Sequence, residues 1–241
     1  MKLKNLKLKK AIFTIGMSCL ITGCKEYELK EINVETQEIV QDKLAYIDND
    51  IIVISEEIVE YKENIYTTAN LNLRKDANTD CEIITVIDKC QKVARIEDLG
   101  EWSYVKYNDL YGYVNNSYIN KLPDNYIEVD ISEQNIKYHI GEEIILDSDV
   151  VTGKQNSMDT RIGMFEIYGK QTARFLMGRW YVDYWMPFDG GIGLHDASWR
   201  DEFGGEIYIN SGSHGCVNLP FDTAKEIYDN SEVGTKVLVH K

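Results

Sequence analysis

Two side chains in the C-terminal third of the chain can together do acyl-transfer chemistry. Cys216 ends the stretch Ser-Gly-Ser-His-Gly-Cys, and His195 lies 21 residues before it. A cysteine becomes a nucleophile when its surroundings favour the thiolate, and a histidine aimed at the sulfur can take the proton. An inert core cysteine beside a structural histidine is the alternative. The polar and glycine residues before Cys216 indicate an exposed turn, so we interpret Cys216 as a nucleophile and His195 as its base.

The immediate neighbours of the thiol suit this chemistry. If the segment is extended, His214 shares a face with Cys216, where it fits a positioning role better than a proton shuttle. Gly212 and Gly215 leave the backbone uncrowded, so a substrate carbonyl can approach. Main-chain N–H groups after Gly215 can then bind an oxyanion.

The elements that must hold these residues are predicted to be mostly strands. Alternating apolar and polar residues predict a hairpin over 126–140, a strand over 179–188 and a closing strand over 234–241. Residues 220–230 are the one convincing helix, and Asp222 can cap its N-terminus. The C-terminal half is therefore expected to be a β structure with a single helix after the cysteine.

A separate small domain is expected over residues 65–122. Five short apolar runs with turn signals about every ten residues favour a small, closed β-barrel. Trp102, Tyr104 and Tyr113 can form a ligand groove there, although packing of the barrel alone would also need large residues.

The N-terminal residues 1–23 are typical of an export signal rather than of a fold. Five lysines precede an apolar run that is too short to span a bilayer and that leads to Cys24. Small residues just before this cysteine resemble the lipobox of bacterial lipoproteins, which implies a lipid anchor on Cys24. An ordinary secretory signal is the alternative, and both place the working protein outside the cytoplasm. Residues 24–64 are rich in acidic and polar side chains, as expected of a tether.

Charge and cysteine content narrow the classes of partner. Without residues 1–23 the chain carries 21 basic and 40 acidic residues, and such a polyanion repels nucleic acid. Cys81 and Cys90 either bridge across a hairpin or stay free. Four histidines and no Cys-x-x-Cys pair argue against structural zinc, and we expect no cofactor.

The cysteine motif carries a specific resemblance. Ser213 to Asn218 reads Ser-His-Gly-Cys-Val-Asn and follows His195 after 17 residues, which resembles the signature of YkuD-type L,D-transpeptidases. The resemblance covers about 126–241. Two positions depart from the family pattern: Arg161 replaces a usual proline, and Asp196 replaces a glycine that is common after the histidine. Residues 65–122 resemble a bacterial SH3-like domain, through motifs at 71–74, 102–107 and 112–114.

The resemblance implies both a fold and a reaction. The expected fold is mainly β, a small SH3-like barrel followed by a YkuD-type β-sandwich or barrel with one main helix after the cysteine. Cys216 would attack the third residue of a peptidoglycan tetrapeptide, release D-Ala as a thioester forms, and pass the acyl group to a neighbouring stem as a 3→3 cross-link. His195 would be the base, and carbapenem-type β-lactams are expected covalent inhibitors. The expected site-shaping residues are Ser213, His214, Gly215 and Asn218, and the expected groove walls are Tyr184, Trp185, Met186 and Trp199.

Other functions remain open at this point. L,D-carboxypeptidase activity or D-amino-acid exchange would use the same site, and an inactive wall-binding lipoprotein would use only the barrel. NlpC-type peptidases place the cysteine before its histidine, and sortases place an arginine after the cysteine. The order of His195, Cys216 and Asn218 argues against both.

Overall fold

The computed structural model describes residues 46–47, 50–51 and 63–241 of the 241-residue chain. The predicted signal 1–23, the proposed lipid-anchored Cys24 and nearly all of the 24–64 segment lie outside the described residues. Strands β1 (Tyr46–Ile47) and β2 (Asp50–Ile51) form a two-residue antiparallel pair. No helix in the described part of the chain is both long and apolar enough to cross a membrane.

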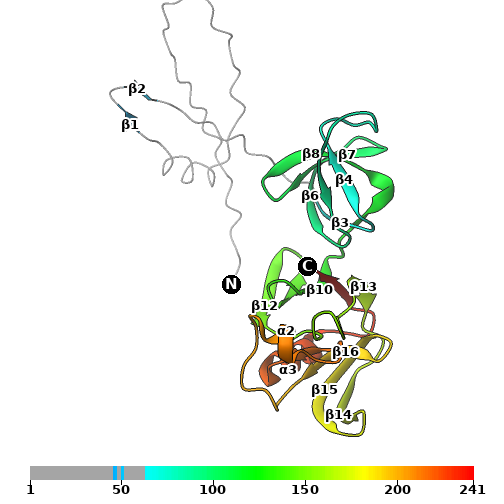
Figure 1. Cartoon of the computed structure of the whole chain (residues 1–241), viewed down its shortest axis with the longest axis vertical. Coiled ribbons are helices and arrows are strands. Elements are labelled where there is room, and N and C mark those ends of the chain that lie inside the picture. Colours follow the sequence, from blue (N-terminus) through cyan, green and yellow to red (C-terminus); the bar gives the residue numbers. More distant parts are fainter. Residues whose placement is uncertain (1–45, 48–49, 52–62) are drawn as a thin grey trace, which may run out of the picture. The chain divides into compact units, whose positions relative to one another are not determined.

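The first domain is an antiparallel sheet in the order β5-β4-β8-β7-β6-β3-β9 (Figure 1). Its elements are β3 (Glu63–Thr67), β4 (Leu71–Arg74), β5 (Ile83–Ile87), β6 (Lys92–Asp98), β7 (Trp102–Tyr107), β8 (Leu110–Asn115), the 3₁₀ turn η1 (Asn116–Tyr118) and β9 (Ile119–Lys121). The five predicted strands are present, and β3 and β9 add two that the pattern did not reveal. Alternate residues such as Leu73, Val105 and Val114 face a closed apolar core.

Two tyrosines of this domain lie on its outer face. Tyr104 and Tyr113 are cross-strand partners on β7 and β8, with ring centroids 5.0 Å apart. Both are only half-buried, whereas their neighbours along the two strands, Ser103 and Val114, are buried. Packing of the barrel core is therefore not what places tyrosines at these positions.

Cys81 and Cys90 are both free thiols, so the disulfide alternative is not what the structure contains. Cys90 is buried, which raises the pKa of its thiol. Cys81 instead donates to the carbonyl groups of Asp76 and Asn78 in its own loop.

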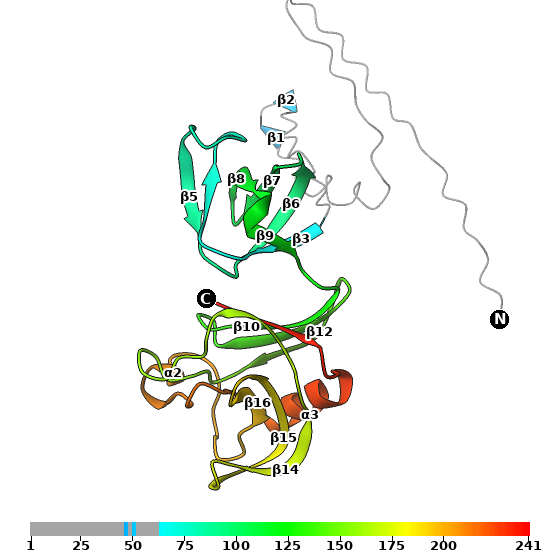
Figure 2. The same ribbon diagram turned by 90° about the vertical axis from the view of Figure 1, so that its right-hand side faces the viewer.

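The second domain has two sheets. One has the order β12-β11-β10-β18-β13 and the other the order β14-β15-β16-β17. The strands are β10 (Asn125–Asp130), β11 (Asn135–Ile140), β12 (Glu143–Asp149), β13 (Gly163–Glu166), β14 (Gln171–Leu176), β15 (Trp180–Asp189), β16 (Ile192–Asp196), β17 (Val217–Leu219) and β18 (Lys236–His240). Within these sheets the pairs β10–β18 and β16–β17 are parallel and the rest are antiparallel. Figure 2 shows β10 and β12 on one side of this domain and β14, β15 and β16 on the other. The expected mainly-β fold is confirmed.

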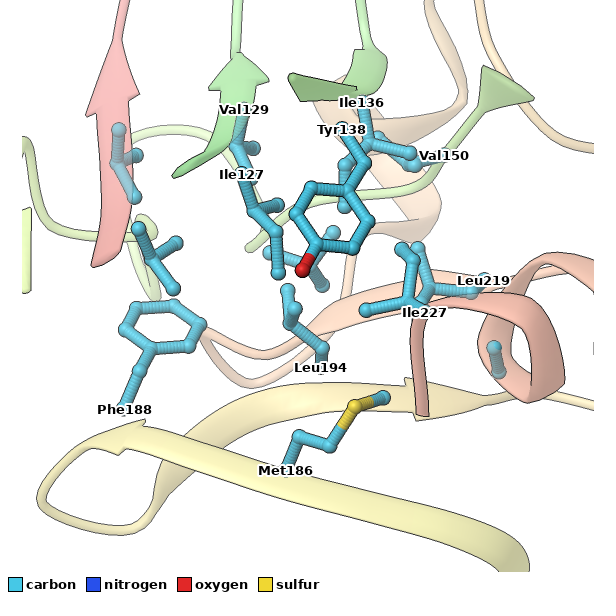
Figure 3. Close-up of a cluster of buried hydrophobic side chains, with 14 of the residues drawn as sticks. Ile127, Val129, Ile136, Tyr138, Val150, Met186, Phe188, Leu194, Leu219 and Ile227 are labelled. Carbon is cyan, nitrogen blue, oxygen red and sulfur yellow. The ribbon is translucent and has the colours of Figure 1, made fainter. Parts of the chain in front are cut away.

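The core of this domain lies between the two sheets. Figure 3 shows Ile127 and Val129 of β10 on the opposite side of the cluster from Met186 and Phe188 of β15, with Leu194 of β16 between. All are nearly inaccessible to solvent. Burial of such side chains contributes roughly 1.5–3 kcal/mol each, so this layer holds β16 firmly in place.

Helix α3 (Phe221–Asn230) covers the edge of this core through Ala224 and Ile227 and packs against β15 and β16. The prediction that Asp222 caps it is wrong. Pro220 occupies the N-cap position, and Asp222 lies in the first turn, where its charge still complements the helix dipole. A short second helix, α2 (Ile207–Ser211), was not predicted.

One charged cluster is buried away from the thiol. The Glu128 carboxylate accepts from His139 Nε2 at 2.7 Å and from His240 Nε2 at 2.8 Å. Burial alone would raise the pKa of Glu128, but these bonds hold it below its usual range. Burial likewise opposes the charge on His240, but Glu128 raises the pKa of that imidazole overall.

Candidate active site

The parallel pairing of β16 and β17 brings the predicted nucleophile and base to one face of a sheet. Leu194 pairs with Val217, and His195 pairs with Asn218. Cys216 directly precedes β17, so it lies two residues before Asn218 on the same strand direction and shares its face. His195 and Cys216 both line one pocket of about 750 Å³.

The pocket walls include some of the predicted residues but not all. Trp185 and Trp199 line it, as do Ser213, His214 and Asn218. Tyr184 and Met186 do not, so the prediction that they form groove walls is wrong. Successive residues of a strand face opposite sides, and with Trp185 toward the pocket its neighbours must face away. Met186 is fully buried in the core, and Tyr184 packs against the ring of Tyr228 at 5.2 Å.

The cysteine turn is held by hydroxyl groups. Ser213 Oγ accepts from the N–H of Gly215 at 3.0 Å and donates to the carbonyl of Cys216 at 2.5 Å. Thr160 Oγ1 donates to the carbonyl of Gly215 at 2.8 Å and accepts from the N–H of Gly153 at 2.9 Å. Sequence reasoning identified Ser213 but not Thr160, which lies more than fifty residues upstream.

Backbone conformation favours glycine at position 215. Its φ is +108°, which other residues rarely adopt, whereas the atom nearest to an added Cβ, Ile192 Cδ1 at 2.5 Å, is the end of a side chain that can shift. This turn also overturns the extended geometry assumed for His214, which points outward and is exposed at the pocket rim. The N–H of Gly215 is already bonded to Ser213, so it is not available to an oxyanion.

Cys216 is a protonated thiol in this environment. Burial raises its pKa, and a hydrogen bond with the backbone of Gly193 only partly offsets this. Its Sγ lies 4.0 Å from the carbonyl oxygen of Gly191.

His195 is buried and held from both sides of its ring. Nδ1 is 2.7 Å from the carbonyl of Asp196, and Nε2 is 3.0 Å from Nδ2 of Asn218. A carbonyl can only accept, so Nδ1 carries the proton and Nε2 the lone pair. Burial lowers the pKa of His195 to about 4, and the charge of Arg200 adds to this effect. At neutral pH the imidazole is therefore uncharged and can act as a base.

The carboxylate of Asp196 holds the main chain of strand β15 rather than the histidine ring. Its Oδ1 accepts from the N–H groups of Asp183 and Tyr184 at 2.8 and 2.7 Å, and its buried Oδ2 has no partner among the described residues. Burial raises the pKa of this carboxyl. The contact of Asp196 with the histidine ring is made by its main-chain oxygen, whereas its carboxylate bonds to β15.

Arg200 is a site residue that sequence reasoning missed. Its Nε donates to Asn218 Oδ1 at 2.8 Å, and its Nη2 donates to the carbonyl of Ser211 at 2.9 Å. An arginine four residues after a strand has no distinctive sequence signal, because such a loop position is usually solvated.

The pocket is cationic although the protein is acidic. Arg174 and Arg200 line it, and no Asp or Glu is among its described lining residues. The whole chain has a formal charge of −14. Such a local field attracts anionic groups of a ligand. In the described part of the chain, no group of His, Cys, Asp and Glu is arranged to hold a metal ion.

Two family models match the chain. Residues 124–239 match the family model of the L,D-transpeptidase catalytic domain, and residues 69–120 match that of the bacterial SH3 domain. No curated protein matches the chain.

Three solved structures are similar to it. The catalytic domain of an E. faecium L,D-transpeptidase is 36% identical over 50% of this chain and 100% of that domain, with a TM-score of 0.45. The same domain acylated by ertapenem is 35% identical, with the same coverage and a TM-score of 0.44. The crystal structure of an Enterococcus faecium L,D-transpeptidase with a cysteine-to-serine mutation is 25% identical over 88% of this chain and 92% of that one, with a TM-score of 0.48.

Proposed function

Because the chain belongs to the family of L,D-transpeptidases, we propose that it forms 3→3 peptidoglycan cross-links through a thioester on Cys216, with His195 as the general base. The observation that carries this proposal is the β16–β17 pairing, which puts both side chains on one sheet face and in one pocket.

Acylation begins with the thiol proton. The Cys216 side chain turns toward His195 Nε2 and replaces Asn218 Nδ2 as the donor to its lone pair, and the proton moves to that nitrogen as the sulfur attacks the carbonyl carbon of the third stem residue. The tetrahedral intermediate collapses, the bond to the terminal D-Ala breaks, and the imidazolium gives its proton to the departing amine. A thioester and free D-Ala result.

The second half-reaction repeats these steps with a new nucleophile. A side-chain amine on the third residue of a neighbouring stem attacks the thioester carbon, and His195 takes the proton that the amine loses. The carbon–sulfur bond breaks, the thiolate recovers a proton from the imidazolium, and the new amide is the 3→3 cross-link. If water attacks instead of the amine, the product is a tripeptide and the enzyme is a carboxypeptidase.

The two groups start as a neutral pair. Burial raises the pKa of Cys216 and lowers that of His195, so a resting thiolate–imidazolium pair is disfavoured. Proton transfer is then coupled to attack on the substrate, as general base catalysis requires.

The charge of the pocket fits a donor stem that carries carboxylates. Arg174 and Arg200 line it without any acidic lining residue. The rings of Trp180 and Trp199 lie tilted against each other on the pocket wall, with centroids 4.8 Å apart, and offer an apolar surface to the peptide backbone. A stem peptide with free carboxylates should therefore bind better than its amidated counterpart.

We also propose that the protein works outside the cytoplasm, anchored to the membrane by lipid on Cys24 and facing the cell wall. The lysine-rich start, the short apolar run and the small residues before Cys24 support this. The outer-face tyrosines of the first domain, Tyr104 and Tyr113, are the candidate contacts for wall peptides. Carbapenems are proposed inhibitors, because a similar catalytic domain is acylated by ertapenem.

Product analysis tests the reaction directly. The full-length chain and its Cys216→Ala variant are incubated with purified disaccharide-tetrapeptide, and the products are weighed by mass spectrometry. Dimers that lack one D-Ala, absent with the variant, support transpeptidation. Tripeptide alone would replace the proposal with carboxypeptidase activity. Incorporation of an added D-amino acid without dimers would indicate D-amino-acid exchange instead of cross-linking. The absence of any product would favour a wall-binding protein without catalytic activity.

A further inference from the structure

Arg200 is bonded to the site without facing an acid. It is half-buried, and its Nε and Nη2 donate to Asn218 and to the carbonyl of Ser211. Among the described residues it forms no ion pair with a carboxylate. A half-buried guanidinium whose N–H groups donate to a neutral amide and a carbonyl is not explained by neutralisation of a nearby charge.

The bond to Asn218 decides which end of that amide faces the histidine. A guanidinium can only donate, so the atom of Asn218 that it contacts must be the oxygen. The nitrogen of the same amide is then directed at His195 Nε2, 3.0 Å away. That nitrogen can only donate, so Nε2 must present its lone pair.

We propose that Arg200 is a positioning residue for the reaction: by fixing the amide of Asn218 it keeps Nε2 of His195 free of a proton and therefore able to accept one. Without Arg200 the amide can rotate and offer its oxygen to Nε2. Because Nδ1 already donates to the carbonyl of Asp196, that arrangement needs protons on both nitrogens and favours the imidazolium, which cannot act as a base.

The other groups around His195 do not supply this control. Trp185 on β15 and Trp199 in the following loop approach the ring at 5.8 Å each and carry no titratable group. Cys216 is the remaining titratable neighbour that shares its sheet face, and the carboxylate of Asp196 is directed to the main chain of β15. Arg200 is therefore the fixed charge that reaches the ring through Asn218.

The test measures the protonation of the ring itself. Nitrogen NMR of the full-length chain follows His195 Nε2 between about pH 3 and 7, a range that brackets its midpoint near pH 4, and its signal is identified by its loss in His195→Ala. Arg200→Met should raise the titration midpoint by about one pH unit, so the rate of carbapenem acylation should fall about fivefold near pH 4 and change little at pH 6, where the imidazole of both proteins is mostly uncharged. Arg200→Lys, which keeps a charged donor, should recover part of both effects. Arg174→Met, which removes the other pocket arginine, should leave the titration of His195 unchanged.

A double-mutant cycle tests whether Arg200 acts by fixing the amide of Asn218, or instead by repelling the charged form of His195 or by supporting its own loop. If Arg200 acts through Asn218, Arg200→Met adds nothing to the acylation loss or titration shift of Asn218→Ala. Additive effects, or an unchanged His195 titration in folded Arg200→Met, would overturn the inference. Should Arg200→Met fail to fold, the same comparison is made with Arg200→Lys, in which an unchanged midpoint and full activity would equally refute it.

The inference rests on the proposed role of His195, but the two can fail separately. The titration needs no substrate, so a shifted midpoint in an enzyme without acyl transfer would contradict the proposed function alone. An unchanged midpoint in an active enzyme would contradict the role of Arg200 alone.

Discussion

Asp196 offers a sharp test of how the structure holds the strand that carries the base. Its Oδ1 accepts from two main-chain N–H groups within β15, those of Asp183 and Tyr184. Its Oδ2 is buried without a partner among the described residues. Oδ1 therefore stabilises the fold through its hydrogen bonds, whereas burial of Oδ2 away from water and without a partner destabilises it.

Two substitutions separate these contributions. Asp196→Ala leaves both N–H groups without their acceptor, at about 1–3 kcal/mol each, with the lower end applying because both are only half-buried. Removing the poorly solvated charge returns part of this, so we expect a net loss of about 1–3 kcal/mol. For a chain of this length that is a fall in Tm of roughly 3–10 °C. Asp196→Asn keeps the acceptor and removes the charge, so its Tm should equal or exceed that of the wild type.

The pH dependence has a definite sign. Burial raises the pKa of Asp196, so the folded state binds a proton more readily than the unfolded chain, and this carboxyl makes stability fall as pH rises through that range. The advantage of Asp196→Asn over the wild type should therefore be small near pH 4 and larger near pH 7. Thermal unfolding of the three proteins at both pH values checks this. Equal Tm values for the alanine and asparagine variants would refute the assignment of the two hydrogen bonds.

Three further predictions concern the site and its support. Alkylation of Cys216 by iodoacetamide should climb steadily with pH and show no plateau at acid pH, because burial lowers the pKa of His195 to about 4 and raises that of the thiol; a flat rate between about pH 5 and 8 would indicate an ion pair instead. Gly153→Ala should cost about 2–3 kcal/mol in chemical denaturation and slow acylation, because its Cβ would lie 2.0 Å from a backbone oxygen, whereas Gly169→Ala, with its nearest neighbour at 3.5 Å, should be nearly neutral in stability. Glu128→Gln should lower stability by about 2–4 kcal/mol, and by more at pH 6 than at pH 9, because the histidine pKa that this carboxylate raises makes its contribution fade as pH rises; an equal loss at both pH values would contradict that coupling.

The strands and the cysteine motif were predictable because each depends on local pattern. Alternation of apolar residues identified 126–140 as a hairpin and 179–188 as a strand, which β10, β11 and β15 bear out. The polar, glycine-rich setting of Cys216 likewise indicated a turn, but this turn is only partly exposed, because Ser213 and Gly215 are buried.

The site residues that were missed or misplaced depend on contacts between distant segments, or on which face of a strand a residue occupies. Thr160 and Arg200 act through hydrogen bonds to residues that only the fold brings near, and neither has a sequence signal of its own. The error at Tyr184 and Met186 was avoidable, because three consecutive residues of a strand cannot all face one wall. The sequence alone did not show that Pro220, two residues before Asp222, occupies the N-cap position of the helix.

Capture of the acyl-enzyme is the most direct measurement of the central claim. The full-length chain is mixed with disaccharide-tetrapeptide, quenched in acid within the first turnover, and digested for mass spectrometry of the peptide that contains residue 216. The account predicts that this peptide gains the mass of the donor stem less D-Ala, that hydroxylamine removes the added mass, and that His195→Ala accumulates far less of it. A stem attached at any other residue, or cross-links still formed by Cys216→Ala, would contradict it.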